Sequence, residues 1–156
     1  MLVTSLLAAG AVQGATELHP PTTLADLQTT LKAKAHVRGQ LNLRATGQIR
    51  PVSTTSQLRK FAADSAADPA ARAQYSREGE FYDGGSVCWV LIPDQLFALY
   101  RSDIAAGTLL RTQVLAVASP GGPPLLLLEG YEVTGQAVVP VAPKRGTSGT
   151  SSLGSK

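Results

Sequence analysis

The chain is poor in cysteine, in aromatic side chains and in charge. Among its 156 residues there is one cysteine, aromatic residues make up 5% and charged residues 16%. A single cysteine excludes an intrachain disulfide and any metal site built on several cysteines. The scarcity of aromatics means that a core must consist mainly of Leu, Val, Ile and Ala. The length suffices for one domain but not for two.

Motifs for catalysis, cofactors and metal ions are scarce as well. Cys88 and His36 are the obvious nucleophile and base to pair, but Cys88 lies in the apolar stretch 87–90, where cysteine acts as a small hydrophobic residue. His19 precedes two prolines and has no partner close to it in the sequence. Neither a glycine-rich phosphate loop nor a nucleophile elbow is present. The sequence therefore predicts a protein that is not an enzyme and that needs no cofactor or metal.

The apolar run at the N-terminus, Leu2–Val12, is too short to cross a membrane as a helix. It is typical of the apolar part of a secretory signal, and the small residues before Ala15 suit cleavage after Gly14. The basic residues that normally precede such a run are missing. We interpret residues 1–14 as a signal peptide of a periplasmic or secreted protein. The alternative is a cytoplasmic protein whose N-terminus packs on its core.

Apolar and polar residues alternate strictly from residue 35 to residue 49. The apolar set includes Val37, Leu41 and Leu43, and the polar set includes Arg38 and Arg44. A period of two residues is typical of a half-buried β-strand. At about 3.3 Å per residue the segment is much longer than a usual strand. It is therefore predicted to form either one long bent strand or two strands broken near residues 46–47.

Helical and loop patterns surround this strand. Residues 22–33 are predicted to form a short helix capped by Thr22 or Thr23, and residues 55–73 a helical stretch interrupted at Pro69. Residues 75–85, rich in Gly, Glu and Asp, are predicted to be a loop. Residues 135–156 are dominated by Pro, Gly, Ser, Thr and basic residues, which is typical of a disordered tail.

Two hairpins are predicted from residue 86 onward. The first pairs residues 86–92 with residues 95–101 around a turn at Pro93–Asp94. The second pairs residues 108–119 with residues 125–134 around a segment rich in proline and glycine. A short helical turn at residues 102–107 would connect the two hairpins.

This order of strands resembles the OB-fold, a five-stranded Greek-key barrel, over residues 35–134. In that family a central glycine, here Gly39, lets the first strand bend and join both sheets. The chain departs from the family plan by a helical insertion at residues 51–85 and by a short segment, residues 102–106, where a helix is usual. The predicted fold is mainly β with one or two short helices: a small antiparallel OB-like barrel preceded by an N-terminal helix and linker, residues 15–34. The residues expected to point inward are Val37, Leu41, Leu43, Val90, Ile92, Leu110, Val114 and Leu126.

Basic residues gather in the first part of this region. No acidic residue lies between Asp26 and Asp64, whereas seven basic ones do: Lys32, Lys34, Arg38, Arg44, Arg50, Arg59 and Lys60. Such a stretch predicts a positive stripe that would attract nucleic acid or another anionic polymer. The other interpretation is a solvated strand face that acids from elsewhere in the chain, such as Glu78 and Glu80, would balance.

The resemblance implies a surface that binds oligonucleotides, oligosaccharides or proteins. The residues predicted to bind a ligand are Arg38, Gln40, Asn42, Arg44, Tyr100, Arg101 and Arg111. Aromatic rings for stacking would come from Trp89, Phe97, Tyr100 or Tyr82. Trp89 and Phe97 lie in apolar runs, however, and their sequence context favours core packing. The first functional hypothesis is an exported module that binds a protein or an envelope polymer. The alternatives are a cytoplasmic single-stranded nucleic-acid-binding protein and a structural subunit.

Overall fold

The computed structural model describes residues 19–136 and contains five strands and several short helices within them. The strands are β1 (His36–Pro51), β2 (Tyr75–Asp83), β3 (Ser86–Pro93), β4 (Leu109–Val117) and β5 (Leu125–Gly135). The helices are α1 (Leu24–Thr30), α2 (Thr55–Asp64), α3 (Pro69–Arg72), α4 (Asp94–Tyr100) and the 3-10 turn η2 (Arg101–Ile104). The predicted signal peptide and most of the predicted tail lie outside the described residues.

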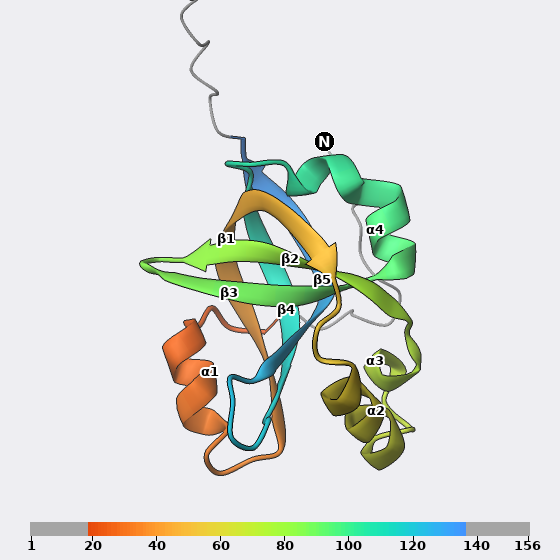
Figure 1. The fold of residues 1–156 in the computed structure, drawn as a ribbon. Coiled ribbons are helices and arrows are strands. Elements are labelled where there is room, and N and C mark those ends of the chain that lie inside the picture. Colours follow the sequence, from red (N-terminus) through yellow and green to blue (C-terminus); the bar gives the residue numbers. More distant parts are fainter. Residues whose placement is uncertain (1–18, 137–156) are drawn as a thin grey trace, which may run out of the picture.

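The five strands form a closed hydrogen-bonded ring in the order β1-β2-β3-β5-β4 (Figure 1). The ring closes because the long strand β1 pairs with β2 on one side and with β4 on the other. This confirms the prediction of a mainly β fold with short helices. The expectation of a purely antiparallel arrangement is wrong for one pair, since β3 and β5 run parallel where Leu91 faces Leu127.

The alternating segment forms one continuous strand, β1, with an irregularity near its middle. The register against β2 shifts between Ala45 and Ile49, and Gly47 has a φ of 90°. A side chain disfavours that conformation, and the backbone of Ala106 also lies close to Gly47. The strand therefore changes register at Gly47. At Gly39 a Cβ atom would lie 2.8 Å from Thr22 and 2.9 Å from Leu27, so glycine allows the segment before α1 and α1 itself to pack closely on β1.

Two sequence predictions in the middle of the chain are wrong. The stretch 75–85 is not a loop, because residues up to Asp83 form β2, which pairs with β3 around a turn at Gly84 and Gly85. The stretch 95–101 is not a strand, because α4 occupies it. Asp94 in the first turn of α4 accepts hydrogen bonds from the N–H and the hydroxyl of Ser76, which ties this helix to the start of β2.

Three further local predictions are confirmed. The helix expected at residues 22–33 is α1, where Thr23 accepts a hydrogen bond from the N–H of Asp26. The helical stretch 55–73 divides into α2 and α3, and Pro69 begins the second helix. The hairpin near the C-terminus is formed by β4 and β5.

The main core fills the inside of the ring. Seven of the eight residues predicted to point inward belong to this buried cluster, and the eighth, Val37, packs against it half-buried. Leu24 and Leu27 of α1 also belong to it, so α1 covers one opening of the ring. Among residues 19–136 no helix is long and apolar enough to cross a membrane.

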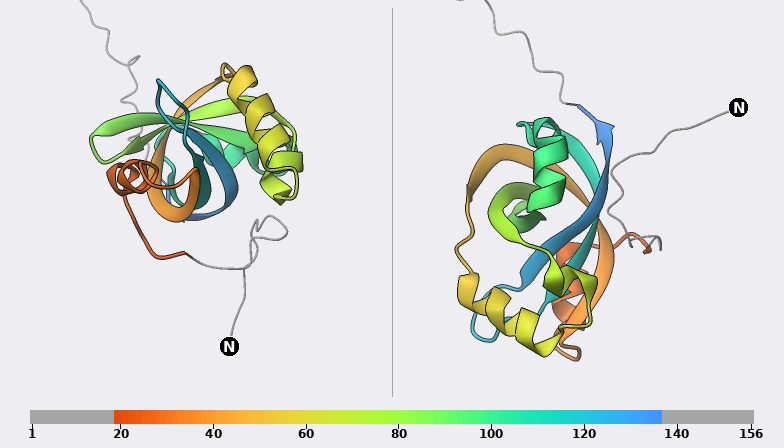
Figure 2. Two further views of the ribbon diagram at one scale, coloured as in Figure 1. Left: turned by 90° about the horizontal axis from the view of Figure 1, so that it is seen from below. Right: turned by 90° about the vertical axis from the view of Figure 1, so that its right-hand side faces the viewer.

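A second apolar cluster lies outside the ring, beneath α2 and α3. Its buried members are Phe61, Ala70, Leu91, Leu115, Leu125 and Leu127. The last four come from β3, β4 and β5, whose outer surface is therefore covered by the helices. Figure 2 shows α1 and the α2–α3 pair on different sides of the ring. The insertion thus covers part of the outer surface of the sheet.

Candidate ligand-binding surface

The seven residues predicted to bind a ligand are distributed over four elements. Arg38, Gln40, Asn42 and Arg44 lie in β1, Arg111 in β4, Tyr100 in α4 and Arg101 in η2. Arg101 is exposed, and the side chain of Tyr100 lies outside the described part of the structure. The positions in β1 and β4 can be compared directly, because these two strands are paired from residue 36 to residue 44.

Arg38 already binds two carboxylates. Its Nε and Nη2 each donate to Glu129 at 2.9 Å, and Nη2 also lies 2.8 Å from Oδ1 of Asp68. The hydrogen bond to Glu129, helped by Asp68, raises the pKa of Arg38 against the effect of burial. Burial opposes ionisation of Asp68, but the N–H of Ala70 and the Arg38 guanidinium together hold the pKa of Asp68 below its ordinary value. Arg38 is therefore balanced by acids from elsewhere in the chain, which agrees with the second interpretation of the basic stripe.

Two other residues of the predicted basic stripe are also paired. Nε of Arg50 lies 2.9 Å from Oε2 of Glu78, and Nζ of Lys60 lies 2.7 Å from Oδ2 of Asp64. Glu78 is 1% exposed and also accepts a hydrogen bond from the hydroxyl of Ser53. The pairing of Arg50 with Glu78 agrees with the interpretation of the stripe as a face balanced by acids from elsewhere.

Gln40 is covered by the segment that precedes α1. Its side-chain oxygen accepts a hydrogen bond from Nε2 of Gln113 at 3.2 Å, and both residues are buried. The N–H of Thr22 donates to the carbonyl oxygen of Gln40, and the N–H of His19 donates to the side chain of Gln113. This part of the polar face of β1 is therefore not open to a ligand.

The exposed part of the predicted face begins at Asn42. Asn42 and Arg44 are exposed, and Arg111, the partner of Asn42 on β4, is exposed as well. Nη1 of Arg111 lies 2.6 Å from Oε2 of Glu132, its neighbour on β5. Within residues 19–136 Arg44 has no ion pair. Arg44 is thus the arginine of β1 that remains available to a partner.

Arg44 lies beside an exposed apolar surface that the loop prediction for residues 75–85 obscured. Arg44 pairs with Tyr82 on β2, and Tyr82 pairs with Val87 on β3. Tyr82 is 45% exposed and Val87 is 49% exposed. Trp89, two residues beyond Val87, points to the same outer side of the sheet. We call the outer surface formed by Arg44, Arg50, Tyr82, Val87 and Trp89 the hairpin face.

A cation–π contact orders one end of the hairpin face. The guanidinium carbon of Arg50 lies 3.7 Å from the centre of the Trp89 ring. Trp89 is half-buried and belongs to neither apolar cluster, so the core interpretation does not apply to it. Phe97, in contrast, packs against the main core and lies beneath Arg77. Of the four candidate stacking residues, Tyr82 and Trp89 therefore lie on the hairpin face.

The charges around the hairpin face nearly cancel. Arg44 and Arg50 are matched by Glu78, which binds Arg50, and by Glu80, which accepts a hydrogen bond from the hydroxyl of Thr46 at 2.8 Å. Exposed Tyr and Val beside a half-buried Trp and two Arg, on a nearly neutral surface, are typical of protein interfaces. A groove that binds nucleic acid carries an excess of positive charge instead.

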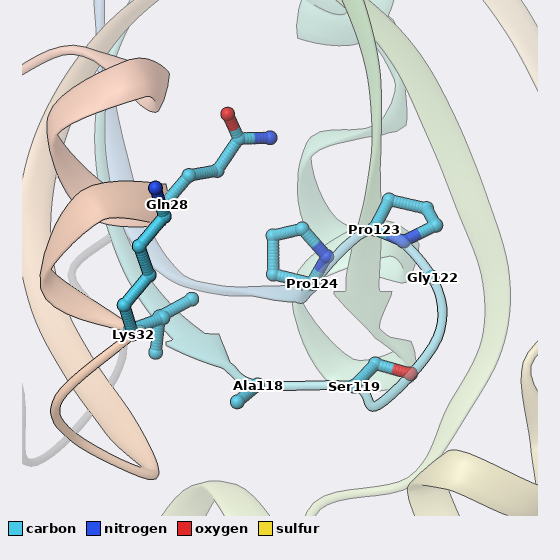
Figure 3. A pocket seen from close by; sticks show the side chains of 8 residues that line it. Gln28, Lys32, Ala118, Ser119, Gly122, Pro123 and Pro124 are labelled. Atoms are coloured by element: carbon cyan, nitrogen blue, oxygen red, sulfur yellow. The ribbon is translucent and has the colours of Figure 1, made fainter.

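An open pocket lies on another part of the surface, between α1 and the loop that joins β4 to β5. Its volume is about 300 Å³, and it is lined by Gln28, Leu31 and Lys32 on one side and by Ala118, Ser119 and residues 122–124 on the other. Figure 3 shows Gln28 on α1 and Lys32 just past the end of this helix, across from Pro123 and Pro124 on the loop. Lys32 is the one charged residue that lines it. The lining offers little polar chemistry to hold a specific ligand.

Two candidate kinds of site, a reactive thiol and a cluster of metal ligands, can be checked directly among the described residues. Burial raises the pKa of the Cys88 thiol to about 12, so the reactive thiolate is scarce near neutral pH. Among residues 19–136 there is no group of three or more His, Cys, Asp or Glu side chains that would hold a metal ion. Comparisons of the chain with models of protein families, with curated proteins and with solved structures find no match.

Proposed function

We propose that the protein is a non-enzymatic binding module of the OB-fold type, and that it binds a protein through the hairpin face. The fold assignment is supported by five strands in a closed ring and by α4, which lies between the third and fourth strands where the OB-fold has a helix. The observation that carries the binding proposal is the exposure of Tyr82 and Val87 beside Trp89 and two arginines.

The balance of charge supports a protein partner over the other candidate ligands. An envelope polymer or a nucleic acid with many negative charges requires several unpaired cations, but Arg38, Arg50 and Arg111 are all bound to carboxylates. A protein partner requires exposed aromatic and apolar side chains with a few polar contacts, which the hairpin face provides. A protein partner is therefore the better match.

Replacing Tyr82 by alanine is expected to weaken binding of the partner about thirtyfold, the effect of losing about 2 kcal/mol at an interface hot spot. The partner would be isolated from an extract of the source cells on immobilised protein and then titrated in purified form. Trp89 is the only tryptophan, so its fluorescence reports binding at this face directly. Asn42→Ala, an exposed change on the neighbouring strand, is the matched control and should bind like the unmodified chain. Equal affinity of the Tyr82→Ala variant would exclude the hairpin face.

Single-stranded nucleic acid is the second candidate ligand, because Tyr82 and the unpaired Arg44 are neighbours in the register and would allow stacking beside a phosphate contact. Binding to oligothymidylate would then weaken with added salt, with a log-log slope of about 0.7 per phosphate neutralised. Salt-dependent binding that Arg44→Ala reduces would replace the protein partner with this ligand.

We also propose that the protein is exported, on the basis of the apolar run Leu2–Val12 and the small residues before Ala15. The mature protein isolated from its source is expected to begin at Ala15. Mass spectrometry of the intact chain measures this directly. A mature chain that still carries Met1 would contradict export by this route and would favour the cytoplasmic alternative.

A further inference from the structure

The pairing between β3 and β5 is the shortest in the closed ring. The ladder between these strands contains a single residue pair, Leu91 with Leu127. The first half of β3, from Ser86 to Val90, pairs with β2 on one side, and no strand within residues 19–136 pairs with it on the other. Figure 1 shows the β2–β3 hairpin extending to one side of the ring. The structure therefore contains a short free strand edge.

The register identifies the backbone groups on that edge. The turn has two residues, so Asp83 and Ser86 exchange hydrogen bonds, and paired and unpaired positions alternate from there. Val87 and Trp89 fall at the positions whose N–H and C=O groups point away from β2. Leu91 lies two residues beyond Trp89, so its backbone groups point to the same side, and it pairs with β5 there, which agrees with this assignment. Val87 and Trp89 thus present two donors and two acceptors at the edge.

This edge lacks three of the features that usually prevent edge-to-edge pairing, and the N-terminus of α1 contacts the hairpin beside the turn, where the N–H of Leu24 donates to Asp83. Proteins protect free edges with charged residues, proline, bulges or a covering element. The sequence Ser86-Val87-Cys88-Trp89-Val90 contains no charged residue and no proline. The irregularity in the β2–β3 ladder lies at the far end, between Tyr75 and Arg77. An uncharged and regular edge is suited to pair with another strand.

We infer that the free edge of β3 pairs with the same edge of a second copy of this chain, in an antiparallel arrangement centred on Cys88. Around a two-fold axis each copy contributes the same residues, so the backbone groups of Val87 meet those of Trp89 in the other copy. Because the edge carries no charge, the two copies meet without repulsion. Each exposed Val87 side chain lies opposite a tryptophan, and such aromatic and β-branched pairs favour pairing across strands.

This arrangement would join two hairpin faces into one surface across the two-fold axis. The inference goes beyond the proposed function, because the dimer would form whether or not a partner protein binds. Loss of the dimer and loss of partner binding are also measured separately. The former is read from the mass in solution without any partner, and the latter from titration of the purified partner with the Tyr82→Ala variant at a protein concentration too low for the dimer.

The test is the molar mass of the full chain, measured by light scattering and sedimentation from nanomolar to millimolar protein. We expect the mass to rise from one chain to two. Val87→Pro removes one edge donor while leaving the bonds to β2 in place, so this variant should stay monomeric. Val87→Thr keeps both the N–H and the branched side chain, so it should still dimerise. Val87→Lys places like charges on the paired edges, and because Val87 is exposed this variant should fold and remain monomeric.

Amide hydrogen exchange gives a second readout on the unmodified chain. At dimeric concentrations the amides of Val87 and Trp89 should exchange slowly, and on dilution they should become fast. The amides of Cys88 and Val90, which face β2, should stay slow throughout. A single-chain mass at every concentration would overturn the inference. So would a dimer that persists in the Val87→Lys variant, or an exchange rate at Val87 and Trp89 that does not depend on concentration.

Discussion

Replacing Leu41 by alanine is expected to lower the free energy of unfolding by about 2 to 5 kcal/mol, the range for large-to-small changes in a packed core. Leu41 is 0% exposed and lies in the middle of β1. Its carbonyl oxygen accepts a hydrogen bond from the hydroxyl of Thr112 at 2.9 Å, which holds β1 and β4 together at this point. The cavity would therefore form where the backbone cannot easily move to fill it. Chemical denaturation followed by Trp89 fluorescence measures the change.

The matched control is Asn42→Ala, one residue along the same strand. Its side chain is exposed and makes no hydrogen bond within residues 19–136, so the change should stay within about 0.5 kcal/mol. A loss below about 0.5 kcal/mol for Leu41→Ala as well would place both faces of β1 in solvent. That result would contradict the closed ring.

Strands whose apolar residues follow a regular local pattern could be predicted from the sequence. The alternation from residue 35 to residue 49 identified β1 and which of its residues point inward. The same reasoning succeeded for β4 and β5, where glycine and proline at residues 120–124 mark the turn between two apolar runs. In these segments the buried positions are occupied by apolar residues, so the order of apolar and polar residues in the sequence is enough to identify the strands.

Strand β2 was missed because its charged residues are stabilised by distant partners. Glu78 and Glu80 made the segment resemble a solvated loop, whereas Arg50, Ser53 and Thr46 bind these carboxylates in the fold. The signal that was present is the alternation of Gly79 and Phe81 with Glu78, Glu80 and Tyr82, followed by Asp83-Gly84-Gly85 as a hairpin turn. Recognising it would have placed Tyr82 on a sheet surface.

Only part of the candidate site could be predicted, because some of its charged side chains are also bound by residues that are distant in the sequence. Arg38 binds Glu129, 91 residues away, and Asp68, 30 residues away, so its neutralisation cannot be inferred from local charge. Arg44 and Asn42 are exposed as expected, because no segment within residues 19–136 covers them. Helix α4 was mistaken for a strand. A helix of seven residues has so few apolar positions that their spacing also fits a strand.

Replacing Phe61 by alanine is expected to cost about 3 to 5 kcal/mol and to loosen α2 and α3 from the sheet. Phe61 is 4% exposed and is the largest residue that α2 contributes to the second cluster, against Leu91, Leu115 and Leu127. Hydrogen exchange should become faster in α2 and α3. Lys60→Ala, which breaks only the exposed ion pair with Asp64, is the matched control and should cost at most about 1 kcal/mol.

The combination of Phe61→Ala with Leu41→Ala would show whether the two clusters act independently. The clusters lie on opposite sides of the strands, one inside the ring and one outside. If the helices form a separate cooperative unit, the two losses should add to within about 0.5 kcal/mol, and exchange in β1 should be unchanged by Phe61→Ala. A coupling larger than about 1 kcal/mol would instead mean that the ring depends on its helical cover. The insertion would then be part of the fold, because the outer leucines of β3, β4 and β5 cannot remain exposed to water without it.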